Sequence, residues 1–211
     1  GQISIGRVGQ FSISANTLMP WPTDQRDRTR SRILESASRL FADKGYEQVC
    51  IDDLMADAGL TRGAFYSHFQ TKAELYAQAI RYAASTGGAR LQELGKGGVG
   101  ALVEGYLQRS HATGESMRCP LAFMAADITQ REPEIRQVYS TALQNFIARL
   151  QQASPTSERT QILQMVVALI GGLVLARAVE EPDLSEEILA ACRSDCHGLL
   201  AQQHSLSAND V

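Results

Sequence analysis

The stretch that decides the fold is TRGAFYSHFQTKAELY, residues 61–76. Phe65 and Phe69 are four residues apart, which places both rings on one stripe of an α-helix and predicts that this stripe is buried. With about 100° of rotation per residue, Gly63 and Ser67 fall on the opposite side of the same helix. That outward strip therefore carries almost no side-chain bulk and can approach a partner closely.

Hydrogen-bonding side chains flank this slim strip on both edges. Tyr66 and His68 project from its two flanks, and Lys72 follows where the next helix begins. The major groove of DNA admits one α-helix and is bordered by phosphates, so the strip suits base edges and the flanking donors suit the backbone. The alternative is a solvated face between two core aromatics, and this stretch by itself does not separate the two.

Helical periodicity extends to both sides of this stretch. An amphipathic helix is expected from about Asp27, with Gly45 as its C-terminal stop. The segment CIDDLMADAGL predicts a short second helix that Gly59 breaks, and Thr61 can then cap the third. This is the arrangement of a helix-turn-helix, and a fourth helix is expected from Thr71.

The remainder of the chain is also helical in pattern, and no useful length alternates with period two. Further helices are expected near 99–111, 120–130, 133–152 and 157–180, with a ninth after Pro182. We therefore predict an all-α protein of about nine helices. A small N-terminal three-helix unit is joined to a larger helical domain through the fourth helix.

Composition is that of an ordinary globular protein. The 211 residues are 44% hydrophobic and 20% charged, and the net charge of -3 predicts no general affinity for polyanions. Four cysteines without dense spacing fit a reducing, cytoplasmic setting. The longest apolar run, about residues 166–176, is shorter than the roughly 18 residues needed to span a bilayer, so we expect no membrane segment. No signal peptide is indicated.

Residues 28–80 resemble the TetR family, the tetracycline-repressor-like transcriptional regulators. The most specific part is GYEQVCIDDLMADAGLTRGAFYSHFQTKAEL, residues 45–75, which holds the family's glycine-aromatic, turn glycine, aromatic-Tyr, His-Phe and Lys-x-x-Leu elements in order. The resemblance implies that Arg62 and Gly63 lie at the base edges. It also implies that Tyr66 and His68 contact phosphate, as does Lys72 with the N-terminus of the fourth helix.

The full set of expected DNA contacts combines this resemblance with the slim strip. It comprises Arg30, Thr61, Arg62, Gly63, Tyr66, Ser67, His68 and Lys72. Thr29 and Arg30 are the weaker phosphate candidates, since a plain solvated N-terminal turn explains them equally well. Val49 and Cys50 stand where the family usually has a Thr-Ser or Thr-Thr pair, so we expect weaker capping of the second helix and one fewer backbone contact.

Two C-terminal segments indicate an interface between subunits. TQILQMVVALIGGLVLARAV, residues 160–179, is apolar around most of its circumference and must be buried on two sides. LSEEILAACRSDCHGLLAQQ, residues 184–203, carries apolar side chains at spacings of three and four. With a two-fold mate these helices would form a four-helix bundle, as the family's last two helices do. The alternative is a monomeric core that uses the same residues.

These expectations define four regions. Residues 1–26 are a disordered arm or a leftover of cloning, 27–72 the helix-turn-helix DNA-binding domain, 73–205 the effector-binding and dimerisation domain, and 206–211 a tail. The leading hypothesis is a homodimeric one-component regulator, a repressor that binds a palindromic double-stranded DNA operator and is released by a small-molecule effector of unknown identity. The expected ligand-binding residues are Tyr106, Cys119, Phe123, Tyr139 and Phe146.

Cysteine chemistry supplies the alternatives. Cys119 stands before Pro120 and beside Arg118, near a predicted helix N-terminus, so it could sense electrophiles or oxidants; the alternative is a buried structural cysteine. A thiol-dependent helical enzyme is the hypothesis from another class, although no catalytic constellation is visible and we expect no enzyme. Cys192, Cys196, His197 and His204 are weak metal candidates because both thiols continue an apolar stripe. No cofactor is expected.

Overall fold

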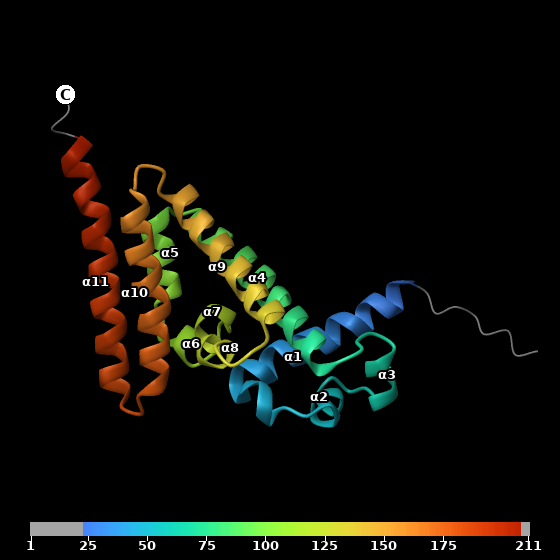
Figure 1. The fold of residues 1–211 in the computed structure, drawn as a ribbon. Coiled ribbons are helices and arrows are strands. Elements are labelled where there is room, and N and C mark those ends of the chain that lie inside the picture. Colours follow the sequence, from blue (N-terminus) through green and yellow to red (C-terminus); the bar gives the residue numbers. More distant parts are fainter. Residues whose placement is uncertain (1–22, 208–211) are drawn as a thin grey trace, which may run out of the picture.

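The computed structural model describes residues 23–207, and every regular element in that range is an α-helix (Figure 1). The all-α prediction is confirmed. The expectations for residues 1–22 and 208–211 concern residues outside the described range. The helices are α1 (Thr23–Gln48), α2 (Ile51–Asp57), α3 (Arg62–Tyr66), α4 (Lys72–Gly95), α5 (Val99–Tyr106), α6 (Arg109–Ala112), α7 (Pro120–Phe123), α8 (Ala125–Ile128), α9 (Pro133–Ala153), α10 (Arg159–Ala178) and α11 (Pro182–Ser207).

The described range has eleven helices where about nine were expected, because two predicted helices are each divided. The segment 99–111 breaks at Leu107, whose φ of -90° and ψ of 42° are not helical, and continues as α6. This break brings Tyr106 and His111 into the core together, where both are fully buried. The segment 120–130 breaks in the same way at Met124, with φ of -112° and ψ of 3°.

The α1–α3 unit forms one end of the molecule and is held by a cluster of buried aromatic rings. The rings of Phe41 and Tyr76 meet edge to face with centroids 4.8 Å apart, which joins α1 to α4. Gly45 and Gly59 have φ of 77° and 64°, left-handed values that glycine adopts without strain. Both predicted stops are therefore confirmed: helical geometry is interrupted at Gly45 within α1, and Gly59 makes the turn after α2.

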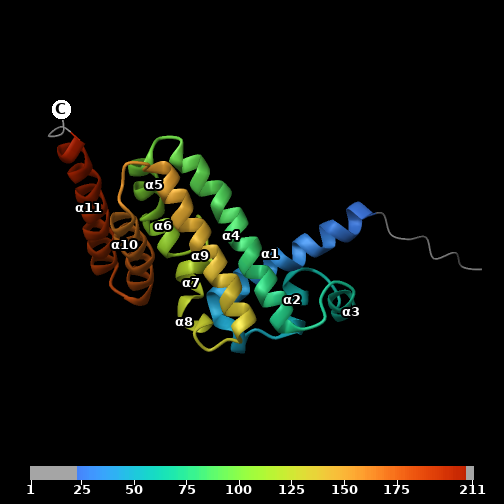
Figure 2. The ribbon, with the colours of Figure 1, turned by 45° about the horizontal axis from the view of Figure 1, so that its top comes forward.

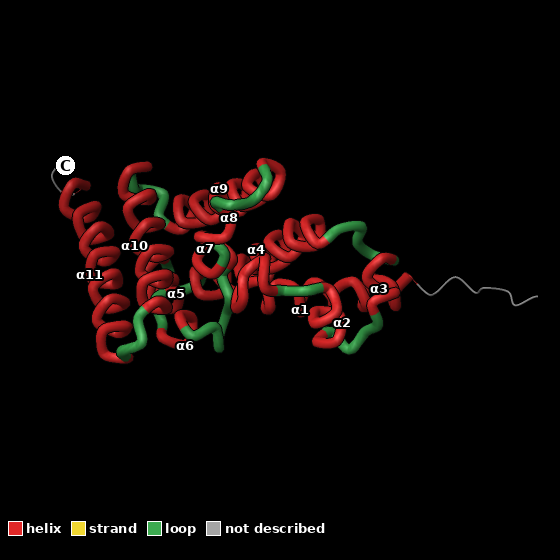
Figure 3. Tube along the Cα trace, turned by 60° about the horizontal axis from the view of Figure 1, so that its bottom comes forward, coloured by secondary structure: helices red, strands yellow, loops and turns green. Residues whose placement is uncertain are grey.

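The long helices α4 and α9 lie side by side and connect this end to the opposite one (Figures 1 and 2). Helices α10 and α11 pack against each other at the far end. Figure 3, from another side, also shows this pair and the α1–α3 unit at opposite ends of the molecule. The α1–α3 unit and the α10–α11 pair are therefore connected mainly through the helices that lie between them.

By length and composition α10 could cross a membrane, and it is the one described helix of which this is true. In this fold the helix buries Met165, Leu169 and Leu173 completely. A core helix has the same composition, so this feature is weak evidence for a membrane span. The opposite side of α10 remains exposed, with Val167 at 71% and Leu175 at 58%.

Candidate DNA-binding surface and internal cavities

The third helix presents the slim strip that the sequence predicts. Phe65 and Phe69 are buried, at 0% and 1% exposure, while Gly63 and Ser67 on the other side are exposed. The Tyr66 side chain is 58% exposed. The strip is therefore free at the surface, and its low bulk leaves room for close approach of a partner.

The helical segment itself is shorter than expected. Helix α3 ends at Tyr66, and Ser67 and His68 form a turn in which the His68 backbone N–H still donates to the Phe65 carbonyl oxygen at 2.9 Å. Thr61 occupies the N-cap position with an extended backbone, but its side chain makes no capping hydrogen bond. The Thr61 hydroxyl is exposed at the N-terminus of α3.

At the start of α2 the sequence departure has a visible consequence. Cys50 is the N-cap residue, and its sulfur accepts a hydrogen bond from the Asp53 backbone N–H at 3.3 Å. A thiol is a weaker acceptor than the hydroxyl usual at this position. The cap is therefore kept in a weaker form, in agreement with the expectation.

The Arg62 side chain lies beside Asp52 and Tyr66 in the structure without DNA. Its Nη1 donates to Asp52 Oδ2 on α2 at 2.8 Å, and both side chains are about 60% exposed. The Tyr66 hydroxyl, together with the Asp52 carboxylate, raises the pKa of Arg62. Exposed ion pairs of this kind contribute little to stability, so Arg62 can exchange Asp52 for a base edge at small cost.

The remaining predicted DNA contacts lie around α3 and are partly engaged. Burial, and then the nearby Arg26 and Arg30, lower the pKa of His68, whose Nδ1 is buried without a hydrogen-bond partner. Arg30 donates to Gln78 and lies 5.2 Å from the centre of the Phe69 ring. His68 is therefore neutral near pH 7 and offers a hydrogen bond instead of a charge.

Lys72 begins α4, and its Nζ lies 4.4 Å from the centre of the Tyr46 ring. The Arg131 guanidinium also lies over Tyr46, at 4.5 Å. Thr71 caps the same helix by accepting from the Glu74 backbone N–H at 3.0 Å. A charged lysine at the N-terminus of a 24-residue helix adds to the positive end of the helix dipole, which favours an anion such as phosphate.

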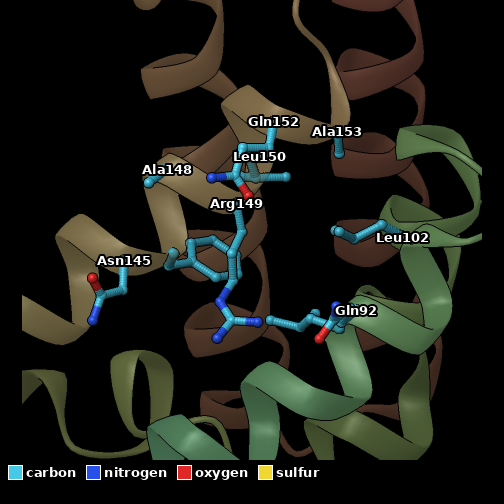
Figure 4. Close-up of a pocket in the computed structure, with 11 residues that line it drawn as sticks. Gln92, Leu102, Asn145, Ala148, Arg149, Leu150, Gln152 and Ala153 are labelled. Atoms are coloured by element: carbon cyan, nitrogen blue, oxygen red, sulfur yellow. The ribbon is translucent and has the colours of Figure 1, made fainter.

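Two adjoining cavities run along the groove between α4 and α9. The Cys119 cavity has a volume of about 700 Å³ and is lined by Cys119, Leu121, Val138 and Phe146, among others. The Leu102 cavity, of about 650 Å³, lies farther along and is drawn in Figure 4. The two cavities share four lining residues, which are Leu91, Asn145, Phe146 and Arg149.

Of the five predicted ligand-binding residues, two line the Cys119 cavity and three line neither cavity. Cys119 and Phe146 line the Cys119 cavity. Tyr106 is fully buried behind them, with its ring 5.5 Å from that of Phe146. The Tyr139 hydroxyl donates to the Leu121 carbonyl oxygen at 2.7 Å, and the Phe123 ring lies 3.3 Å from the Arg177 guanidinium carbon. A ligand role for any of the five stays a prediction.

Arg149 and Gly88 were missed by the sequence reasoning. The signal available was the pair Gly87-Gly88 inside α4, an unusual feature of a helix interior. A Cβ atom at Gly88 would lie 2.7 Å from Arg149 Nη2. Glycine at this position is what allows the guanidinium to lie on the backbone of α4, where Nη1 donates to the Gly88 carbonyl oxygen at 2.8 Å.

The sulfur groups do not form a metal site in the part of the chain that the structure describes. Among the side chains that the structure describes, residues 25–202, no group of three His, Cys, Asp or Glu could hold a metal ion. Cys196 is buried, and the exposed His197 pairs with Glu104 at 2.7 Å. The side chain of His204 lies outside the described residues.

A helix-turn-helix with a slim exposed third helix, attached to a helical body with cavities along a groove, is an architecture that suits a DNA-binding regulator. Residues 33–79 match the model of the bacterial regulatory proteins of the tetR family. Residues 33–79 are thus the DNA-binding domain of a TetR-family regulator, and the described chain has the helical fold of that family.

Similar sequences share this N-terminal region. The chain is 42% identical over 52 residues to the regulator TtgR of Pseudomonas putida, a match that covers 25% of each chain. It is 37% identical over 54 residues to AcrR of Shigella flexneri, covering 26% of this chain and 25% of that protein. It is also 36% identical over 56 residues to the activator FasR of Mycolicibacterium smegmatis, covering 26% of each. The matched region thus spans about a quarter of these relatives.

Similar structures extend over most of the chain. A TetR-family regulator from Cytophaga hutchinsonii has a TM-score of 0.68 at 18% identity, covering 82% of this chain and 96% of that one. One from Chloroflexus aurantiacus has the same TM-score and coverage at 23% identity. At these identities the likeness concerns the fold. The relatives are transcriptional regulators and not enzymes, which speaks against the enzyme hypothesis.

Proposed function

We propose that this protein is a one-component transcriptional repressor that binds a palindromic DNA operator as a homodimer and leaves it when a small molecule occupies the helical domain. The observation that carries the proposal is the exposed strip of Gly63 and Ser67 on a buried aromatic base, with Arg62 and Tyr66 beside it. This strip fits a major groove, while Lys72 and His68 supply donors for the flanking phosphates.

The homodimer is supported by the exposed side of α10. Leu163, Val167 and Leu175 are 41%, 71% and 58% exposed, and all three lie on one stripe with Gly171. Among the described residues, and apart from the neighbouring residues of α10 itself, no atom lies within 4 Å of a Cβ built at Gly171, so a second helix could approach closely there. A second copy of the chain would cover this stripe and present two recognition helices to two half-sites.

Release by an effector is supported by the position of α4. The helix carries Lys72 at its first turn and lines the Cys119 cavity through Gly87 and Gly88. A ligand that changes the packing of α4 against α9 would therefore tilt the helix that carries the α1–α3 unit. A coupling free energy of roughly 1 to 3 kcal/mol would suffice for a useful switch.

The electrophile-sensing alternative has less support. Cys119 is 5% exposed, and burial raises the pKa of its thiol, so little reactive thiolate would form at neutral pH. The proposed repressor acts in the cytoplasm, where thiols stay reduced.

The test is selection of genomic DNA fragments by the purified protein, followed by sequencing. The expected result is an inverted repeat whose half-site centres are about 34 Å apart or a multiple of that. Recovery of single half-sites would contradict the dimer. Recovery of no sequence preference at any salt concentration would contradict operator recognition.

A further inference from the structure

Two arginines, Arg81 and Arg149, and one carboxylate, Glu134, line the Cys119 cavity, and Arg149 is the more buried of the two cations. Arg149 is half-buried, and none of the ion pairs among the described residues includes it. Its hydrogen bond goes to the neutral Gly88 carbonyl oxygen. A guanidinium partly withdrawn from water gains from a counter-charge, and an anion would supply one.

The other charges on the cavity wall balance each other. Arg81 and Glu134 both line the cavity, and their formal charges cancel. Arg149 therefore sets the net charge of the lining. The remaining polar side chains of the lining, on Ser85, Gln137, Thr141 and Asn145, are uncharged.

Much of the cavity lining is apolar. Met117, Leu121, Val138 and Phe146 contribute to it, and Gly87 leaves the wall formed by α4 free of side-chain bulk at that position. A Cβ at Gly87 would lie 3.3 Å from the Met117 sulfur, so the wall is already close to its neighbours. The volume of about 700 Å³ falls in the range of sites for small organic ligands.

We propose that the Cys119 cavity binds an amphipathic organic anion, with its acidic group at Arg149 and its apolar body against Leu121 and Phe146. Figure 4 shows Arg149 extending from α9 toward α4. This orientation places the guanidinium across the groove, where an acid can reach it. The inference rests on the proposed function only in calling this ligand the effector; the binding itself is independent of DNA.

Two fluorescent probes with closely related apolar bodies test the charge requirement. One is 1-anilinonaphthalene-8-sulfonate, an anion, and the other is N-phenyl-1-naphthylamine, which lacks the sulfonate. The Arg149→Gln variant is expected to weaken sulfonate binding roughly tenfold or more, equivalent to about 1.4 kcal/mol. Binding of the neutral amine should stay within about twofold. Equal effects on both probes, or no effect on the sulfonate, would overturn the proposal.

Further variants test whether the two probes bind in the Cys119 cavity or elsewhere on the protein. Arg136 is exposed on the same helix and does not line the cavity, so Arg136→Gln should leave both affinities unchanged. Thr141 is exposed at the cavity wall, and its hydroxyl donates only to the Gln137 carbonyl oxygen of its own helix. Thr141→Trp should therefore fill the cavity without unfolding the chain, and weaken both probes. Sulfonate fluorescence retained in Thr141→Trp but lost in Val167→Glu would mean binding to the exposed side of α10 and would overturn the site.

Selection of DNA by the same variants separates this inference from the proposed function. Arg149→Gln is expected to select the same inverted repeat as the unchanged protein. If the repeat is recovered but probe binding ignores Arg149, the ligand inference fails alone. If the probes behave as expected and no repeat is recovered, the regulator proposal fails alone.

Discussion

The Tyr76 hydroxyl donates a 2.6 Å hydrogen bond to Asp127 Oδ2, and the same oxygen accepts from the Tyr46 backbone N–H at 3.2 Å. Tyr76 belongs to α4, Tyr46 to the last part of α1 and Asp127 to α8. One carboxylate thus joins three helices. The α1–α3 unit is held to the body of the protein at this point as well as through the continuous α4.

Removal of this carboxylate should destabilise the protein strongly. Asp127→Ala leaves the buried Tyr76 hydroxyl and the Tyr46 N–H without an acceptor, so we expect the free energy of unfolding to fall by about 2 to 4 kcal/mol. Tyr76→Phe removes one bond and should cost about 1 to 2 kcal/mol. Urea denaturation measures both, with the exposed Glu180→Ala as a control expected to change stability by less than about 0.5 kcal/mol. Equal stability of Asp127→Ala and the control would contradict the anchoring role.

Sequence preference should depend on Arg62. Arg62→Ala removes the exposed guanidinium at the start of α3, and we expect it to weaken binding to the preferred operator by about 1 to 3 kcal/mol. Binding to unrelated DNA should fall less, so discrimination at one base position is lost. Fluorescence anisotropy with a panel of single-base operator variants measures this. An unchanged preference at every position would mean that Arg62 does not read a base.

Lys72 should contribute affinity without specificity. Lys72→Ala is expected to weaken binding to all sequences and to reduce the slope of log affinity against log salt by about one. Lys96 caps the other end of the same helix, where it pairs with Glu93, so Lys96→Ala is the matched loss of one charge. The control should leave the slope unchanged. Equal slopes for the two variants would remove the phosphate role from Lys72.

The sequence predicted the fold well because local patterns decide it. Phe65, Phe69, Gly45 and Gly59 each signal burial or a left-handed turn through their immediate neighbours, and the structure has them as expected. The interruption at Leu107 was not predictable, since residues 106–111 contain neither a proline nor a glycine that would signal a break. It depends on the tertiary burial of His111, which no local spacing encodes.

The candidate sites likewise include features that local sequence spacing predicts and features that it does not. The recognition strip is a property of one short segment and was visible in its spacing. The pairing of Arg62 with Asp52 and the seat of Arg149 on Gly88 join residues 10 and 61 positions apart. Such contacts depend on how helices pack, and a single sequence carries no direct record of them.

Stability should depend on pH through His111. Its Nδ1 lies 2.7 Å from the Tyr106 carbonyl oxygen, which can only accept, so Nδ1 carries the proton and the buried Nε2 is left without a partner. Burial lowers the pKa of His111 to about 4, below the usual value of 6.5. The unfolded chain therefore takes up a proton first as the pH falls.

This shift reduces the free energy of unfolding as the pH falls from 6.5 to about 4, with no contribution above pH 7. The expected loss from this group is roughly 3 kcal/mol. Urea denaturation at several pH values should show a shallower decline in His111→Gln than in the unchanged protein. Parallel pH profiles for the two would mean that His111 titrates normally in the fold.

Assembly should depend on the exposed stripe of α10. Val167→Glu places a charge at the centre of the proposed two-fold contact, once from each subunit, and desolvating two like charges opposes association. Sedimentation velocity should show dimers for the unchanged protein and monomers for the variant, with operator affinity reduced at least roughly tenfold because each monomer reaches one half-site. Gln144→Glu adds the same charge at an exposed position of α9 that lines neither cavity, and should remain dimeric. A dimeric Val167→Glu would place the subunit contact elsewhere on the molecule.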